Sequence, residues 1–108
     1  SPVAQLNLGN MYNNGEGIPK DYTQAMMWRR LAAEQGLPEA QSKVGAMYFL
    51  GQGVPQDFVL AYMWFNLAAA GGAADTAKFR DYAAERMTPA QIAEAQRLAR
   101  EWQPPKKK

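Results

Sequence analysis

The stretch GEGIPKDYTQAMMWRRLAAEQG at residues 15–36 returns as GQGVPQDFVLAYMWFNLAAAGG at residues 51–72. The likeness extends upstream, because nearly half of the positions are identical when residues 1–36 are laid over residues 37–72 without a gap. A period of this length is typical of proteins that stack pairs of helices into an array. The doubled stretch therefore predicts two repeat units, at residues 1–36 and 37–72.

Each unit opens with a predicted helix that has one apolar face. The apolar positions follow the helical spacing i, i+4, i+7 and i+8: Ala4, Leu8, Met11 and Tyr12 in the first unit, and Ala40, Val44, Met47 and Tyr48 in the second. Gly9 and Gly45 lie inside these helices, where glycine costs about 1 kcal/mol relative to alanine. We therefore expect a neighbouring helix to approach closely at both glycines.

A glycine-rich segment, residues 15–19 and 51–55, links the first helix of each unit to the second. Gly15 and Gly51 suit a left-handed residue at the end of a helix, and the proline that follows in each copy prevents the helix from continuing. A phosphate-binding loop also contains paired glycines, but it needs a preceding strand and a following Lys-Ser/Thr, which this sequence lacks. The pattern favours a plain turn between helices.

The second helix of each unit is expected to begin at an aspartate cap, Asp21 or Asp57, with Gln24 completing a box-like pair in the first unit only. Its predicted buried face consists of Ala25, Trp28, Leu31 and Ala32, which recur as Ala61, Trp64, Leu67 and Ala68. Arg29 and Arg30 become Phe65 and Asn66 in the second unit. We interpret this pair of positions as variation on the solvent side; the alternative is that the paired arginines bind an acidic partner.

These residues resemble the Sel1-like repeat, a bacterial and eukaryotic relative of the tetratricopeptide repeat. The family's pattern of Ala, Leu-Gly, Met-Tyr, Gly-x-Gly-Val-Pro, Asp, Ala, Trp, Ala-Ala and Gly is matched almost fully in both units. The resemblance implies an all-α fold, a right-handed α-solenoid of antiparallel helix pairs. It also implies a scaffold used mainly for protein–protein contacts. Since Asp21 and Asp57 are better explained as helix caps, the residues themselves predict no enzyme.

Residues 73–103 are expected to form a helix pair that caps the array. The first helix of this pair is expected to end near Met87, and Thr88, Pro89 and Gln91 then provide an N-cap, a first-turn proline and a capping-box residue. The last helix has a single apolar stripe: Ile92, Ala95, Leu98, Ala99 and Trp102. Residues 104–108 are expected to form a disordered basic tail.

Composition excludes several kinds of site. The chain has no cysteine and no histidine, so it lacks the thiolate ligands and the imidazole on which most metal sites and much acid–base catalysis depend. Without Lys106, Lys107 and Lys108 the formal charge of +2 falls to about −1, so we expect no nucleic-acid partner. No apolar run approaches the roughly 20 residues that span a bilayer, and we expect no membrane insertion. No cofactor, metal or catalytic residue is predicted.

The candidate binding residues lie on the first helix of each pair, which lines the inner groove in related arrays. They are positions of these helices that do not belong to the predicted packing face: Leu6, Asn10, Asn13, Asn14, Ser42, Ala46, Phe49, Leu50, Lys78 and Tyr82. Asparagine amides bind an extended peptide through paired donor and acceptor groups. Since Phe49 and Leu50 replace Asn13 and Asn14 in the second unit, we expect an apolar pocket beside a polar clamp. The expected partner is a protein or a peptide.

Other interpretations stay open on the sequence. Asn13 and Asn14 also suit a helix end, and Phe49 and Leu50 also suit packing against the third unit. The whole chain also fits a purely structural C-terminal segment of a longer array, or a weak β-lactam-binding hydrolase, although it has no Ser-x-x-Lys motif. Because no polar helix precedes the first unit, its apolar face is expected to be covered by a further repeat or by self-association.

Overall fold

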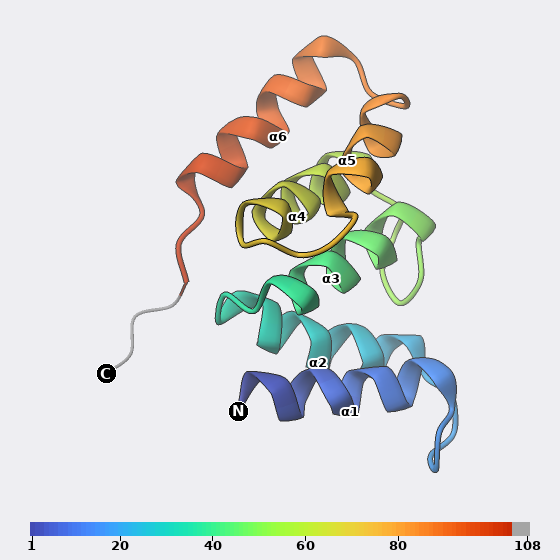
Figure 1. Ribbon diagram of the computed structural model, residues 1–108. Coiled ribbons are helices and arrows are strands. Elements are labelled where there is room, and N and C mark those ends of the chain that lie inside the picture. Colours follow the sequence, from blue (N-terminus) through green and yellow to red (C-terminus); the bar gives the residue numbers. More distant parts are fainter. Residues whose placement is uncertain (105–108) are drawn as a thin grey trace.

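A computed structural model describes residues 1–104, and every regular element within that range is an α-helix (Figure 1). The helices are α1 (Pro2–Asn14), α2 (Tyr22–Glu34), α3 (Pro38–Leu50), α4 (Phe58–Ala70), α5 (Thr76–Ala84) and α6 (Pro89–Glu101). The all-α prediction is confirmed. The rest of the predicted basic tail, residues 105–108, lies outside the described residues.

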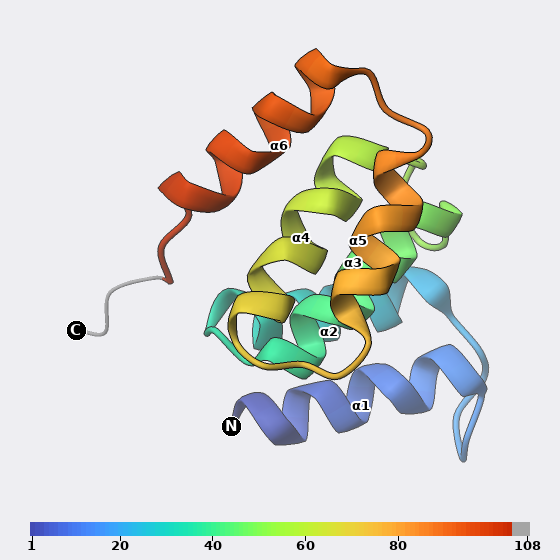
Figure 2. The same cartoon turned by 45° about the horizontal axis from the view of Figure 1, so that its top comes forward.

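The first four helices pack as two consecutive pairs that stack in chain order. α1 lies against α2, α2 against α3, and α3 against α4, as the lower part of Figure 1 shows. α4 then lies between α5 on one side and α6 on the other (Figure 2). The main hydrophobic core runs through this stack, from Leu6 on α1 to Ala99 on α6.

The turn between the helices of each pair has the same backbone in both repeats, because the same residues cap it. Gly15 and Gly51 both have a φ of 71°, and each donates its N–H to the fourth residue back, Met11 or Met47, at 2.8 Å. Asp21 and Asp57 are extended, with φ of −152° and −151°, and each accepts a hydrogen bond from a backbone N–H in the first turn of its helix. The predicted glycine and aspartate caps are confirmed, but Gln24 does not complete a capping box, because the backbone N–H of Asp21 donates to the carbonyl of Tyr12.

The close helix approach expected at Gly9 and Gly45 is also confirmed. A Cβ placed on Gly9 would lie 2.8 Å from Cγ of Arg29, and one placed on Gly45 would lie 2.7 Å from Cδ1 of Phe65. Both distances are too short for carbon atoms that are not bonded. Each glycine therefore makes room for one large side chain from the partner helix of its pair.

The third unit departs from the predicted helix pair, because α5 and α6 each pack against α4 and not against each other. Its predicted helix start is confirmed at α6, and its predicted helix end is wrong at α5. Thr88 and Gln91 form the capping box, and Pro89 opens α6. However, α5 ends at Ala84 and not near Met87, because residues 85–87 tighten into turns that bond three or four residues back before Thr88 caps the next helix. The predicted apolar stripe of α6 faces the stack, where Trp102 meets Trp64 edge to face with ring centroids 5.9 Å apart.

The buried faces of α1 and α2 differ from the predicted ones. Ala4 and Met11 are exposed, although the matching Ala40 and Met47 are buried against α2 in the middle of the stack, because no helix of the described chain covers that side of α1. On α2 the buried residues are Ala25, Met26, Arg29, Ala32 and Ala33. Leu31, which was expected to be buried, is 40% exposed, so the prediction for this face is off by about one residue.

Candidate functional site

An apolar hollow of about 260 Å³ lies between α3, α4 and α5. Its lining consists of Ala46, Phe49, Leu50, Phe65, Phe79 and Tyr82. α3 contributes its last two turns, α4 provides the floor through the buried Phe65, and α5 forms the opposite wall. We call these six residues the apolar pocket.

The walls of the apolar pocket are held by contacts among aromatic rings. Phe79 lies 5.8 Å from Phe65 and 6.3 Å from Tyr82, measured between ring centroids. Phe49 packs edge to face on Phe58 at 5.5 Å, and the guanidinium of Arg86 lies 5.2 Å from the Phe49 centroid. The pocket is thus largely preformed, with one cation beside the Phe49 wall.

A second hollow, with several polar lining residues, lies next to the apolar pocket, between the first half of α3 and the loop that leads into α5. It measures about 330 Å³ and shares Phe79 with the pocket. Its other lining residues are Glu39, Ser42, Lys43, Ala73, Ala74 and Asp75. We call the two adjacent hollows, one apolar and one with polar lining residues, the α3–α5 groove.

The structure brings together five of the ten predicted binding residues. Ala46, Phe49, Leu50 and Tyr82 line the apolar pocket, and Ser42 lines the second hollow. Lys78 is exposed on α5 but lines neither hollow. Leu6 does not belong to any accessible surface: it is 2% exposed and lies in the core between α1 and its neighbours, so its prediction is wrong.

Sequence reasoning missed two lining residues, Phe65 and Phe79. Phe65 occupies the position of Arg29 in the repeat, which was interpreted as solvent-facing. A usable signal existed, because Phe65 follows the small Ala61 by four residues and so lies on the same face of the helix. Phe79 lies within the first predicted helix of the third unit, but the sequence does not show which face of that helix packs toward α3.

The prediction for Arg29 is also wrong, because its side chain is buried and not solvent-facing. It is 5% exposed, whereas its neighbour Arg30 is exposed, as predicted. Nε and Nη2 of Arg29 both donate to Oδ1 of Asn10, at 3.0 and 2.8 Å, and Nη1 donates to Oδ1 of Asn13 at 3.1 Å. Burial lowers the pKa of the Arg29 guanidinium, but arginine remains protonated under ordinary conditions.

Arg29 thus links Asn10 to Asn13, and further hydrogen bonds lead from Asn13 to the loop after α1. Asn13 donates from Nδ2 to Oδ1 of Asn14 at 3.0 Å, and Asn14 donates from Nδ2 to Oε1 of Glu16 at 2.8 Å. Asn13 and Asn14 therefore do help to hold the helix end, as the structural interpretation expected. Asn10 has no such role, since its oxygen binds Arg29 alone.

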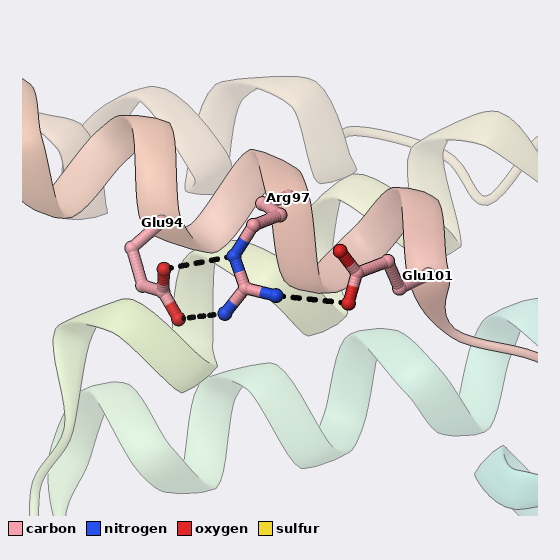
Figure 3. Close-up of polar contacts among 3 residues, drawn as sticks. All are labelled: Glu94, Arg97 and Glu101. Atoms are coloured by element: carbon pink, nitrogen blue, oxygen red, sulfur yellow. Dashed lines mark hydrogen bonds and ion pairs between the residues drawn. The ribbon is translucent and has the colours of Figure 1, made fainter.

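Six carboxylates of the described chain lie in helix caps or surface ion pairs: Asp21 and Asp57 in caps, and Glu34, Asp81, Glu94 and Glu101 in ion pairs. Arg97 on α6 donates to Glu94 through Nε and Nη2 and to Glu101 through Nη1, on the solvent side of the helix (Figure 3). The hydrogen bond from Arg97 lowers the pKa of Glu94, and the bonds to both glutamates raise the pKa of Arg97. Such exposed pairs contribute little to stability. Within residues 1–104, no group of three or more metal-ligating side chains comes together.

None of the helices described in residues 1–104 is both long enough and apolar enough to cross a membrane.

Comparison with known proteins supports the interpretation of the repeats. The model of the Sel1 repeat family matches residues 2–37 and 38–72. A comparison with curated protein sequences found no match. Among solved structures, the chain resembles c5321, a protective antigen of uropathogenic Escherichia coli strains with an SLR fold, at 37% identity and a TM-score of 0.91.

A second similar structure is a Sel1 repeat protein from Oxalobacter formigenes, at 42% identity and a TM-score of 0.73. The matches cover 94% and 75% of this chain, but the chain spans only 22% of the Escherichia coli protein and 61% of the Oxalobacter protein. The stacked pairs, the shared turn and the two matched repeats all agree, and the chain belongs to the Sel1 repeat family.

Proposed function

We propose that the chain binds an extended segment of a protein partner in the α3–α5 groove, with one large apolar side chain of that segment in the apolar pocket. Sel1 repeats generally serve as scaffolds for protein–protein interactions. The observation that carries the proposal is the apolar lining itself, in which Leu50, Phe79 and Tyr82 remain 57%, 39% and 44% exposed. Clustered exposed apolar side chains mark interaction sites more often than isolated ones do.

The dimensions of the groove favour a polypeptide over a small molecule. At about 260 Å³ the apolar pocket is smaller than the roughly 300–1,000 Å³ of most small-molecule sites, so it has room for little more than one large side chain. The adjacent hollow, with its polar lining residues, gives the neighbouring residues of an extended segment a place to form hydrogen bonds. A peptide with one apolar anchor and polar neighbours fits both hollows.

Truncating the pocket is expected to weaken peptide binding. The probe is a fluorescein-labelled nonapeptide of glycine and serine with a central tryptophan, followed by fluorescence polarisation. Leu50→Ser and Phe79→Ser should each raise the Kd about five- to hundredfold, because each removes apolar contact area worth about 1–3 kcal/mol. Both side chains are partly exposed, so the fold should tolerate the changes.

Leu31→Ser is the matched control, because Leu31 is 40% exposed on α2 and lines neither hollow. It should leave the Kd unchanged. The proposal is wrong if Leu31→Ser weakens binding as much as the pocket variants do. It is equally wrong if a peptide with central alanine binds as tightly as the tryptophan peptide.

A second proposal, self-association through α1, rests on the unequal burial of matched residues. Met11 is 38% exposed, whereas the matching Met47 is 1% exposed because α2 covers it. We expect concentration-dependent dimerisation in sedimentation equilibrium, and Met11→Lys should raise the dissociation constant at least about tenfold through the cost of burying an unpaired charge. Met27→Lys, at a position 46% exposed on α2, is the control. A chain that stays monomeric at millimolar concentration would rule this proposal out.

We propose no catalytic function. Sel1 repeat proteins are generally non-enzymatic scaffolds. The support from this chain is that Asp21 and Asp57, the carboxylates that recur in both repeats, accept hydrogen bonds from the backbone of the helices they cap.

A further inference from the structure

Arg29 carries a buried charge that no carboxylate of the described chain balances. Arg30, Arg80 and Arg97 each lie beside a carboxylate, but Arg29 forms no ion pair within residues 1–104. Its hydrogen-bond partners are two neutral amide oxygens. A buried charge without a counter-ion is costly, so a partner that supplied an anion here would gain free energy from the pairing.

The amide of Asn10 binds this buried guanidinium and belongs to a residue that is itself partly exposed. Because Oδ1 of Asn10 accepts both bonds from Arg29, the Nδ2 group is turned away from the guanidinium, and it has no acceptor among the described residues. The adjacent Asn13 differs, since its Nδ2 group already donates to Asn14. Asn10 therefore presents free N–H donors that a neighbouring positive charge polarises.

The repeat places these residues on the same side of the molecule as the apolar pocket. Asn10, Asn13 and Arg29 precede Ala46, Phe49 and Phe65 by 36 residues, and those three residues line the pocket. Gly9 and Gly45 leave the equivalent space free in the two repeats. A Cβ on Gly9 would lie 2.8 Å from Arg29, and one on Gly45 would lie 2.7 Å from Phe65. This space thus holds a cation in the first repeat and an aromatic ring in the second.

We propose that the first repeat forms a carboxylate subsite, in which the Asn10 amide donates to an acidic group of the partner segment and the Arg29 guanidinium behind it supplies the charge. The inference rests on the proposed peptide-binding function and adds the chemistry of the partner. The partner segment carries an apolar side chain for the second repeat and an aspartate, a glutamate or a C-terminal carboxylate for the first.

The test uses fluorescein-labelled peptides of glycine and serine that contain one tryptophan and one glutamate, separated by two to six residues. A matched series has glutamine in place of glutamate. At the best separation the glutamate peptide should bind at least about tenfold more tightly than its glutamine counterpart, because hydrogen bonds to charged groups exceed neutral ones by this order. Arg29→Met should abolish the preference, whereas Arg30→Met, an exposed neighbour, should keep it.

Asn10→Asp provides an independent test that does not depend on removing the buried arginine. The new carboxylate would lie within hydrogen-bonding distance of Nε and Nη2 of Arg29, so it should raise the Tm and remove the preference for glutamate peptides at the same time. Asn7→Asp adds the same charge at an exposed position of α1 and should do neither. A purely structural arginine would predict the higher Tm with no change in peptide preference.

The outcomes separate this inference from the proposed function. Equal binding of glutamate and glutamine peptides at every separation overturns the carboxylate subsite but leaves the apolar pocket in place. Retention of the glutamate preference in Arg29→Met or Asn10→Asp also overturns it. If no tryptophan peptide of either series binds, the proposed function itself fails.

Discussion

Gly53→Ala is expected to destabilise the chain by about 3 kcal/mol, and Gly17→Ala by only about 1 kcal/mol, because overpacking adds to backbone strain at one site alone. Both glycines have a φ of 77°, so the strain of a side chain in the left-handed region is the same. They differ in surroundings, since a Cβ on Gly53 would lie 2.3 Å from the carbonyl oxygen of Tyr22. Backbone cannot move aside as a side chain tip can, so the repeats would have to separate.

The pair of variants thus isolates the contact between successive repeats. Around Gly17 no atom would come within 4 Å of the new Cβ, although the loop has the same conformation. Urea denaturation of both variants measures the difference directly. Equal losses of stability would show that the loop of the second repeat does not rest on α2 as described.

Trp64→Ala is expected to cost about 3–5 kcal/mol, which is the usual range for removing a buried tryptophan. Trp64 is 3% exposed and its ring meets that of Trp102, so the change leaves a cavity and also releases the end of α6. Loss of near-ultraviolet circular dichroism and a lower midpoint in urea would report both effects.

Trp28→Ala is the matched control, since Trp28 occupies the same position in the first repeat. Trp28 is only partly buried, and its Nε1 hydrogen has no acceptor in the described chain, so part of its burial is already unfavourable. The loss should be clearly smaller than for Trp64→Ala. A larger loss for Trp28→Ala would contradict the difference in burial between these two tryptophans.

Features that depend on a few neighbouring residues could be predicted from the sequence. Gly15, Asp21 and Thr88 each determine a turn or a cap through backbone geometry and hydrogen bonds that close within a few residues. The end of α5 was placed about three residues too late because its last turn resembles a helix in pattern but not in bonding.

Features that depend on a neighbouring helix were harder to predict. The apolar positions of α1 repeat those of α3, but only α3 has a helix on both sides, so Met11 is exposed where Met47 is buried. Arg29 was interpreted as a surface residue because Phe65 replaces it in the second unit, whereas the space opened by Gly9 allows it to lie inside.

The residues of the candidate site also divide into those that the sequence predicts and those that depend on a neighbouring helix. Ala46, Phe49 and Leu50 could be selected from the sequence because they share one side of α3. Phe65 and Phe79 come from other helices, and their place in the apolar pocket depends on how α4 and α5 pack against α3. A repeat pattern predicts how helices pair more readily than it predicts which side chains meet between them.

The central claim is that partners bind in the α3–α5 groove, and mapping the contact by NMR tests it most directly. With ¹⁵N-labelled chain and the tryptophan nonapeptide, the account predicts that the largest amide shift changes fall on α3 and α5, around Ala46, Phe49, Leu50, Phe79 and Tyr82. Shift changes concentrated on the solvent side of α6, around Glu94 and Arg97, or on α2 around Met27, would contradict it.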